Sequence, residues 1–399
     1  MSADSLETEL RKRLPDEIRS HWGRVFRPPV EVQEIGRLAY NLFLADNALF
    51  SLRADYLGVP EQEVLEMCLD LVGAPEGAWA SFTSGGSESI YSALHAIREW
   101  AKSAKPGLRR FEVIAPYSAH PTFSKGCHYL GLDLKRVPIG ADLRADAKLL
   151  RQAVTENTVA VIGSAPGWSY GRFDDILALG AIAEDHDLWL HVDACVGGYL
   201  APFVEELGVP LPRWDFRVPA VRSISADLHK FGYCPKPAST VLWRSSDYQK
   251  FHYVHPADWP GGAYRTQGFA GSRSAGPIFA AWATMKFLGR SGYARLAGQV
   301  MERKKQLSQA IGRIEGLFVL ENDLLPLCFG AETVDLGTIL TNMRQRGWLL
   351  VASSNPPLVQ LPIDPAADDE VVRVFLEELT IATREARSSR KSDSGALHY

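Results

Sequence analysis

One short segment of the chain brings a histidine and two lysines together. It reads SADLHKFGYCPK and contains His229, Lys230 and Lys236. Lysines are usually solvated, so the simplest interpretation is an exposed loop. The runs at 221–225 and 239–244 on either side are, however, short and apolar, as in buried strands. A lysine held between core elements loses its proton more easily and acts as a nucleophile toward carbonyl groups, so the segment indicates Schiff-base chemistry.

The overall composition is that of an ordinary globular protein. Of the 399 residues 46% are apolar, and 43 basic residues stand against 47 acidic ones, for a formal net charge of −4. The chain has no long block of either sign, so neither nucleic acid nor an anionic membrane is an expected partner. Small neutral or anionic substrates remain open.

The sequence shows no pattern typical of export or of membrane insertion. Its start, MSADSLETELRKRLPDE, is charged, and no apolar run approaches the roughly 18 residues of a membrane span. The cysteines are odd in number, scattered and without metal-ligand spacing, which fits free thiols in a reducing compartment. They are Cys68, Cys127, Cys195, Cys234 and Cys328. We therefore expect a soluble, cytoplasmic protein without a disulfide framework.

Alternating strand-like and helix-like segments predict an α/β fold. The runs FEVIAP, LKRVPI, TVAVIGSAP and LWLHVD are β-rich, and segments such as FDDILALGAIAEDHD lie between them. Short connections of this kind predict a mostly parallel sheet with helices on both faces. We expect a helical and extended segment at 1–54, a large domain at 55–288, a small α/β domain at 289–388 and a disordered tail at 389–399. A long amphipathic helix is expected at 292–314, within the small domain.

In an open parallel sheet, ligands bind at the carboxyl ends of the strands, so the residues that close each strand were compared. Asp193 ends the apolar run of LWLHVDACVGG. It has two interpretations. It is either a turn or helix-cap aspartate, or an anion aimed at a cationic group such as a protonated pyridine nitrogen.

Two other segments carry polar residues at such positions. In TSGGSESI, Gly86 and Ser87 begin a predicted helix, whose free N–H groups and dipole suit a phosphate, although such residues also cap helices that bind nothing. In APYSAHPTFSKGC, His120 follows a strand and is either structural or catalytic. A metal site built on the His191–Cys195 stretch or on Asp227 needs further ligands, for which the sequence shows no pattern.

Together these parts suit pyridoxal phosphate, which needs an anchored phosphate, a stacked ring, a protonated pyridine nitrogen and a lysine for its aldehyde. The segments TSGGSESI, APYSAHPTFSKG, LHVDACVGGY, WDFRVPAVRSISADLHKFGYCPK and DWPGGAYRTQGFAGSR resemble those of the sphingosine phosphate lyases. These belong to the group II pyridoxal-dependent decarboxylases of fold type I. The resemblance covers about residues 40–300, in order and with similar spacing, and it implies a mostly parallel, seven-stranded sheet.

The resemblance also implies roles for the residues that hold the cofactor. Lys230 would form the Schiff base with pyridoxal 5'-phosphate. His229, Gly86 and Ser87 would contact its phosphate, and Ser272 of GFAGSR would reach in from a second subunit. The family pattern thus implies a homodimer with sites at the subunit interface.

Further roles concern the ring and the substrate. His120 would stack on the pyridine ring, and Asp193 would bond its nitrogen. Lys236 matches a lysine that helps to bind the substrate phosphate in the lyases, and Tyr233 stands where a nearby aromatic residue is usual.

The chain departs from the lyase pattern in segments that line the pocket in the family. It reads FGYCPKPAS where the lyases typically read YGYAPKGSS, and SAPGWSYG where they carry a segment like TPQFPHG. The changed positions are Phe231, Cys234 and Pro237, with Gln267, Gly268 and Phe269 before AGSR. The resemblance therefore does not establish that a long-chain sphingoid substrate is accepted.

Three functions are consistent with these patterns. The first is a carbon–carbon lyase that cleaves a β-hydroxy amine, with or without a phosphate, to an aldehyde and an amine. The second is an amino acid decarboxylase, and the third is a cofactor-binding protein without catalysis. Lys236 favours the lyase, whereas a carboxylate-binding arginine such as Arg265 or Arg273 would favour decarboxylation. The lyase needs a base for the hydroxyl proton, for which Lys236, Tyr233 and Lys230 are candidates.

Overall fold

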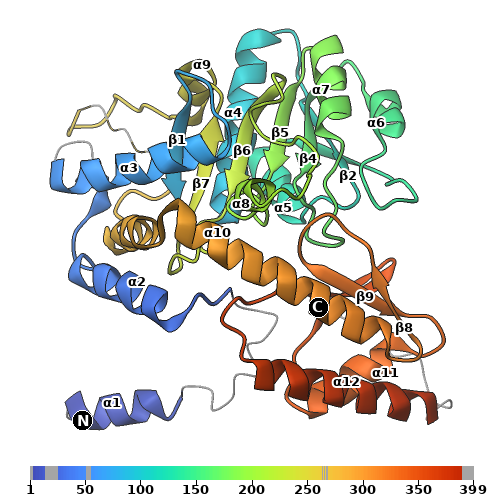
Figure 1. The fold of residues 1–399 in the computed structure, drawn as a ribbon. Helices are drawn as coiled ribbons and strands as arrows, with labels where there is room; N and C mark the ends of the chain where they lie inside the picture. Colours follow the sequence, from blue (N-terminus) through green and yellow to red (C-terminus); the bar gives the residue numbers. More distant parts are fainter. Residues whose placement is uncertain are drawn as a thin grey trace.

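A computed structural model describes residues 3–13, 26–50, 55–262, 264, 266 and 268–388. Its main feature is a seven-stranded sheet in the order β1-β7-β6-β5-β4-β2-β3 (Figure 1). The strands are β1 (Trp79–Thr83), β2 (Glu112–Pro116), β3 (Asp133–Val137), β4 (Thr158–Ser164), β5 (Trp189–Asp193), β6 (Val221–Ala226) and β7 (Ser239–Trp243). β7 runs antiparallel to both of its neighbours, and the other neighbouring pairs are parallel.

Helices cover both faces of this sheet because its strands carry apolar side chains on both sides. All residues of β4 are buried, and Val161 and Ile162 belong to two different core clusters. The helices that follow the strands are α4 (Gly86–Ala104), α5 (Thr122–Leu130), α6 (Ala147–Ala153), α7 (Ile176–Asp185), α8 (Ala201–Glu206) and the short α9 (Ser246–Gln249). The α/β fold with a mostly parallel sheet, predicted from the sequence, is confirmed.

A second, antiparallel sheet lies in the C-terminal part of the chain, in the order β10-β11-β9-β8. Its strands are β8 (Leu317–Leu320), β9 (Leu327–Ala331), β10 (Val351–Ser354) and β11 (Pro357–Leu361), and its helices are α11 (Leu336–Gln345) and α12 (Asp369–Ser388). The long helix α10 (Gly276–Gly312) runs from the large sheet to the small one (Figure 1). It is kinked at Gly289, where φ is 56°.

The N-terminal part contributes α1 (Ala3–Arg11), α2 (Val30–Leu42), a 3-10 turn at Ala48–Phe50 and α3 (Asp55–Leu71). Both α2 and α3 pack against α10. Among the described helices, none combines the length and the apolar character that crossing a bilayer would require.

Sequence and structure differ in three elements, α10, β1 and β7. α10 begins at Gly276 instead of residue 292, because the kink at Gly289 joins two helical segments that the apolar pattern treats separately. The edge strand β1 and the reversed direction of β7 were not predicted, since periodicity carries no information on strand direction. The domain boundaries at 54, 288 and 388 stay predictions, and the predicted tail at 389–399 lies outside the described residues.

Candidate active site

A cavity of about 480 Å³ lies where β4 and β5 end and α4 begins. Lys230 lines it and follows β6 in the turn that leads to β7. The other lining residues come from the chain start, the α4 turn and the strand ends: Phe26, Ser84, Gly85, Gly86, Ser87, Glu88, Ile90, His120, Thr122, Ser164, Pro166, Trp168, Asp193, Cys195, Val196, Asp227 and His229. The carboxyl ends of the strands therefore bring together the residues predicted to hold the cofactor.

Lys230 forms an ion pair with Asp227, which lies three residues earlier in the same turn. Its Nζ lies 2.9 Å from Asp227 Oδ2, and the side chains of lysine and aspartate are 24% and 4% exposed. Ser239 on β7 donates a hydrogen bond of 2.5 Å to Oδ1 of Asp227. Ser239 in turn contacts Ser89 of α4 at 2.9 Å, and Ser89 contacts Thr83 of β1 at 2.6 Å. A buried row of hydroxyl groups thus connects the ion pair to the sheet edge.

This ion pair changes the protonation of Lys230. Burial alone would lower the pKa of Lys230, but the adjacent carboxylate of Asp227 outweighs burial and raises it above the usual lysine value. The same contacts lower the pKa of Asp227 although burial opposes this. The inference that Lys230 loses its proton easily because it is buried was therefore wrong. A neutral amine requires that Asp227 first be neutralised or its field compensated.

His229 is held by the backbone of the next strand. The backbone N–H of His229 donates to the carbonyl of Ala238 at 2.9 Å, and the backbone N–H of Ala238 donates to the ring Nδ1 of His229 at 3.3 Å. Nε2 lies 3.6 Å from Asp227 Oδ2. Burial lowers the pKa of His229, and because Nδ1 accepts a hydrogen bond, the neutral ring carries its proton on Nε2.

Asp193 ends β5 and is 8% exposed. Its Oδ1 accepts hydrogen bonds from the Cys195 N–H at 3.1 Å and from the Ser225 hydroxyl at 3.3 Å. No residue in the described parts of the chain donates to Oδ2. An acceptor-only group that lines the cavity with one oxygen unused suits a cationic N–H of a bound ring.

The start of α4 packs closely against the Lys230 side of the cavity, which requires glycine at its first position. A Cβ atom at Gly86 would lie 2.8 Å from Cys195 Sγ and 3.0 Å from both carboxylate oxygens of Asp227. Ser87 follows at the first turn, whose N–H groups have no partners within the helix. Glu88 accepts from the Ser84 N–H at 2.7 Å, which fixes the entry of the chain into the helix.

His120 lies on the cavity wall, just before α5. Its Nδ1 is 2.8 Å from Thr122 Oγ1 and 3.3 Å from the Thr122 N–H, so the two residues fix the ring between them. The partly enclosed position lowers the pKa of His120, which favours the neutral ring at physiological pH. A neutral, fixed imidazole is suited to stacking on another flat ring.

The two other predicted catalytic residues line a different cavity. It has a volume of about 470 Å³, adjoins the first, and shares Phe26 and His229 with it. Lys236 lies there, and burial together with the charge of Lys230 lowers its pKa. Tyr233 lies there too, at a positive φ of 58°. Burial raises the pKa of Tyr233, and its hydroxyl has no hydrogen-bond partner among the described residues.

The segment near residue 270 is not part of the Lys230 cavity within one chain. Ser272 is exposed, and its hydroxyl accepts from Asn47 Nδ2 at 3.0 Å. Glu88 accepts from the Phe269 N–H at 3.1 Å, and a Cβ atom at Gly268 would meet the same carboxylate at 2.5 Å. Pro237 and Gly268 line a small cavity of about 120 Å³. The predictions for Arg265 and Gln267 lie outside the described residues.

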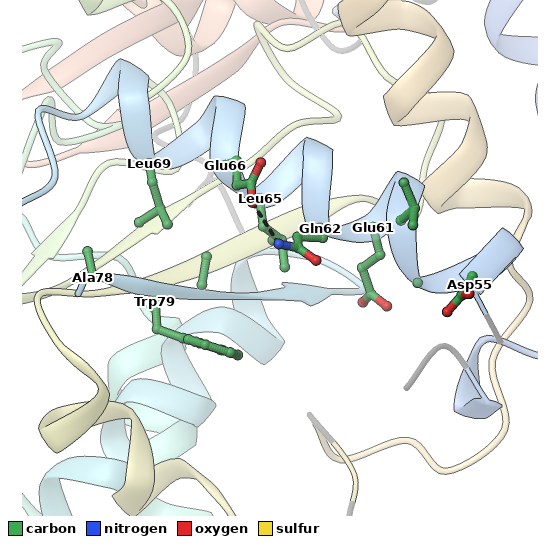
Figure 2. Close-up of a pocket in the computed structure, with 11 residues that line it drawn as sticks. Asp55, Glu61, Gln62, Leu65, Glu66, Leu69, Ala78 and Trp79 are labelled. Carbon is green, nitrogen blue, oxygen red and sulfur yellow. Dashed lines mark hydrogen bonds between the residues drawn. The ribbon is translucent and has the colours of Figure 1, made fainter. Parts of the chain in front are cut away.

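A further cavity of about 420 Å³ lies between α3 and β1, and its lining differs in chemical character from that of the Lys230 cavity (Figure 2). Figure 2 shows carboxylates of α3 along it, with Gln62 Nε2 donating to Glu66 at 2.7 Å and the Trp79 ring on the strand side. Glu61 is paired with Arg273 at 2.7 Å. Among the described residues, neither a lysine nor a histidine lines this cavity.

Metal chemistry finds no support in the geometry. Across the described ranges there is no group of three or more histidine, cysteine, aspartate or glutamate side chains placed to hold an ion. All five cysteines are buried and unpaired.

Comparisons with known proteins agree with this geometry. Residues 59–331 match the family described as the pyridoxal-dependent decarboxylase conserved domain. The sphingosine-1-phosphate lyase of Arabidopsis thaliana is 37% identical over 347 residues, which cover 84% of this chain and 62% of the plant protein. A probable L-tyrosine/L-aspartate decarboxylase of Methanothermobacter thermautotrophicus is 33% identical over 80% of this chain and 86% of its own length.

A solved structure is similar over nearly the whole chain. The structure of the sphingosine-1-phosphate lyase of Burkholderia pseudomallei superposes with a TM-score of 0.92 at 36% identity, covering 98% of this chain and 92% of that one. The chain belongs to the pyridoxal-dependent decarboxylase family and has its fold type I architecture, and the cofactor of this family is pyridoxal 5'-phosphate. The chain spans about 60% of the length of the plant lyases that it matches.

The residues of the cavity fit this cofactor. Lys230 would supply the amine, Asp193 an acceptor for the ring nitrogen, and the start of α4 donors for the phosphate. Ser164 gives an independent indication, because its buried hydroxyl lines the cavity and finds no hydrogen-bond partner among the described residues. An orphaned hydroxyl of this kind is expected where a polar ligand completes the site.

Sequence reasoning missed part of this site. Asp227 was considered only as a metal ligand, although its position three residues before Lys230 in a turn was a usable signal. Two further residues gave no signal in the sequence. Phe26 is distant in sequence from the other site residues, and Ser225 lies inside a strand. Trp168, in contrast, belongs to the segment SAPGWSYG that departs from the lyase pattern, and it does line the cavity.

The assignment of Lys230 can be tested by covalent trapping. We expect purified protein loaded with pyridoxal phosphate to be yellow, and borohydride to fix a pyridoxyl group on Lys230, as mapped by peptide mass spectrometry. Lys236→Ala is the matched control and should be labelled like the parent protein, because Lys236 lies in the adjoining cavity. Label on Lys236, or no label at all, would contradict the assignment.

Proposed function

We propose that this chain is a pyridoxal phosphate-dependent carbon–carbon lyase, whose substrate is a phosphorylated β-hydroxy amine that it cleaves to an aldehyde and a phosphorylated amine. The observation that carries the proposal is the cationic cavity beside Lys230. Lys236, Arg27, Arg37 and His229 line it, and no aspartate or glutamate does so among the described residues. Lys236, Arg27 and Arg37 give this cavity a positively charged lining, which suits an anionic substrate group, and a phosphate is the strongest such group.

The cofactor, when bound, supplies an electron sink for the bond that breaks at the amine-bearing carbon. The chain has three tasks. Lys230 would hold the cofactor, Asp193 would accept from the ring nitrogen and keep its positive charge, and His120 would pack against the ring. Asp227 keeps Lys230 in the cavity and lies within reach of its proton, at 2.9 Å.

A lyase also needs a group that takes the proton from the substrate hydroxyl. Tyr233 is poorly suited, because burial raises its pKa and makes the phenolate rarer. Lys236 is better suited, because burial and the charge of Lys230 lower its pKa toward the working range of a base. We therefore assign this proton transfer to Lys236, with binding of the phosphate shared by Arg27 and Arg37.

Decarboxylation is the second candidate function, and the archaeal relative described as a probable decarboxylase supports it. It would need an arginine for the substrate carboxylate near the cofactor. Arg273 is paired with the buried Glu61 at 2.7 Å and is not among the described residues that line the Lys230 cavity. The described residues therefore favour the lyase.

A homodimer completes the proposal. Three large aromatic side chains are exposed, namely Tyr117 (54%), Tyr129 (65%) and Phe269 (61%), and the last two both contact the Tyr91 ring of α4. A second copy that covers them would bury apolar surface and bring its exposed Ser272 within reach of the first copy's cofactor phosphate. Sedimentation equilibrium tests this, and a monomer mass at all micromolar concentrations would contradict it.

The reaction class is tested by product analysis. Purified protein is incubated with pyridoxal phosphate and a panel of amino acids and phosphorylated β-hydroxy amines, and the products are identified by mass spectrometry. We expect an aldehyde and a phosphorylated amine from the phosphorylated substrates only. Release of carbon dioxide from an amino acid, with no aldehyde from the panel, would show the decarboxylase instead.

Substitutions of Lys236 distinguish a role in substrate binding from a role in proton transfer. Lys236→Ala should leave the absorbance of the bound cofactor unchanged, because the cofactor has its own contacts at His229 and α4. Loss of a partly desolvated partner costs about 2–5 kcal/mol, or tens-fold to several thousand-fold in apparent affinity.

Lys236→Arg is the matched variant, because it keeps the charge but not the proton transfer. If Lys236 is the base, the arginine variant should bind substrate and lose turnover, whereas a purely electrostatic role predicts that arginine restores both. Parent-like KM and kcat in both variants would remove Lys236 from the reaction.

A further inference from the structure

A row of polar side chains lies buried behind Asp193. Trp189, His191 and Asp193 alternate along β5 and therefore share one face of the sheet. On β6, Ser223 lies opposite His191, and Ser225 lies opposite Asp193. All of these side chains except Asp193 are inaccessible to solvent, and Asp193 is 8% exposed at the cavity end. Buried polar groups of this kind must satisfy one another.

The hydrogen bonds form one continuous chain. Trp189 Nε1 donates to Ser223 Oγ at 2.8 Å, and Ser223 Oγ is 2.8 Å from His191 Nδ1. His191 Nε2 is 3.3 Å from Ser225 Oγ, which is 3.3 Å from Asp193 Oδ1. The chain crosses between the two strands four times and ends on the carboxylate that faces the cavity.

The two ends fix the direction of every bond between them. An indole N–H can only donate, and an ionised carboxylate can only accept. Ser223 therefore accepts from Trp189, which leaves its single hydrogen for His191 Nδ1. Nδ1 is then an acceptor, so the neutral ring carries its proton on Nε2 and donates to the oxygen of Ser225.

The Ser225 hydroxyl accepts two hydrogen bonds and donates one. Besides His191 Nε2, the Cys195 thiol lies 3.5 Å from Ser225 Oγ on the donor side. Both lone pairs of Ser225 are then occupied, and its hydrogen is left for Asp193. Burial lowers the pKa of His191 to about 4, so the ring stays neutral at physiological pH and the direction of the chain is kept.

We infer that this one-way chain of hydrogen bonds makes His191 and Ser225 positioning residues that hold Asp193 ionised and turned toward the ring nitrogen of the cofactor. Oδ1 is held by Ser225 and by the Cys195 N–H, so Oδ2 is the oxygen left for the ligand. Donors in series polarise one another, so each bond in the chain strengthens the next. The inference rests on the proposed role of Asp193.

If His191 had only a structural role, the expected effects of its substitution would differ from those of a positioning role. If His191 only filled the core, its tautomer would be immaterial and its loss would lower stability without changing the cofactor. If it positions Asp193, its loss should change the protonation of the bound ring while the cofactor stays attached through Lys230. The two roles therefore differ in a spectroscopic property of the ligand.

The first measurement uses the unmodified protein. ¹⁵N NMR of histidine-labelled protein should show His191 as the neutral tautomer with its proton on Nε2, unchanged between pH 6 and pH 8, a range chosen around the ordinary histidine pKa of about 6.5. Assignment uses the missing signal of His191→Gln. A proton on Nδ1, or a charged ring in this range, would overturn the inference, because the direction of the chain would be lost.

The second measurement follows the ring nitrogen of pyridoxal phosphate labelled there with ¹⁵N. We expect Ser225→Ala and His191→Leu to keep the bound cofactor, to reduce protonation of the ring nitrogen and to lower kcat by about 10- to 100-fold, as loss of supporting hydrogen bonds does at other sites. His191→Gln, which can still donate to Ser225, should recover part of this loss.

His95→Gln is the matched control, since His95 is another buried histidine, on α4, with a pKa lowered to about 4 by burial. It should behave like the parent protein. If Asp193→Asn changes the ring nitrogen but Ser225→Ala and His191→Leu do not, the inference fails and the role of Asp193 stands. If Asp193→Asn changes nothing either, the proposed role of Asp193 fails with it.

Discussion

The buried ion pair between Lys230 and Asp227 is the interaction on which the site depends. Taking two charges out of water is costly unless they meet at short range and are further hydrogen-bonded, and breaking such a pair by removing one partner costs about 3–5 kcal/mol. Here the distance is 2.9 Å, and Ser239 supplies the additional bond to the carboxylate. The pair therefore holds a lysine in a cavity that it would otherwise avoid. It also keeps that lysine charged until a ligand compensates Asp227.

The fold makes this arrangement possible by bringing strand ends together. β5 and β6 end in carboxylates that face the same cavity, Asp193 directly and Asp227 one residue after the strand. The reversed strand β7 returns beside β6 and supplies Ser239, and α4 begins with a glycine, because a Cβ atom there would be too close to Cys195 and Asp227. The ring, the phosphate and the aldehyde of pyridoxal phosphate would then each meet a chemically suitable group, and these groups lie on different elements of the fold.

The sequence predicted the fold class and the residues that carry local signals. Apolar strand runs ending in polar residues located Asp193, and a lysine between two such runs located Lys230. It could not predict which way β7 runs, and so it missed the bond from Ser239 to Asp227. Cross-strand register is likewise absent from a linear pattern, which is why Ser223 and Ser225 gave no signal. The raised pKa of Lys230 was missed because burial was weighed without the partner that counteracts it.

The most direct test of this account is the pH dependence of covalent cofactor capture by Asp227→Asn. Attachment of pyridoxal phosphate requires the neutral amine, so its rate rises with pH through the pKa of Lys230. In the parent protein Asp227 raises that pKa, whereas in the amide variant this contribution is lost, so burial, which lowers the pKa, is opposed only by Cys195 and Asp193. The account predicts that the rate profile of the variant, followed by the absorbance of the bound cofactor and trapped on Lys230, moves to lower pH. An unchanged profile, or one moved to higher pH, would show that Asp227 does not control Lys230.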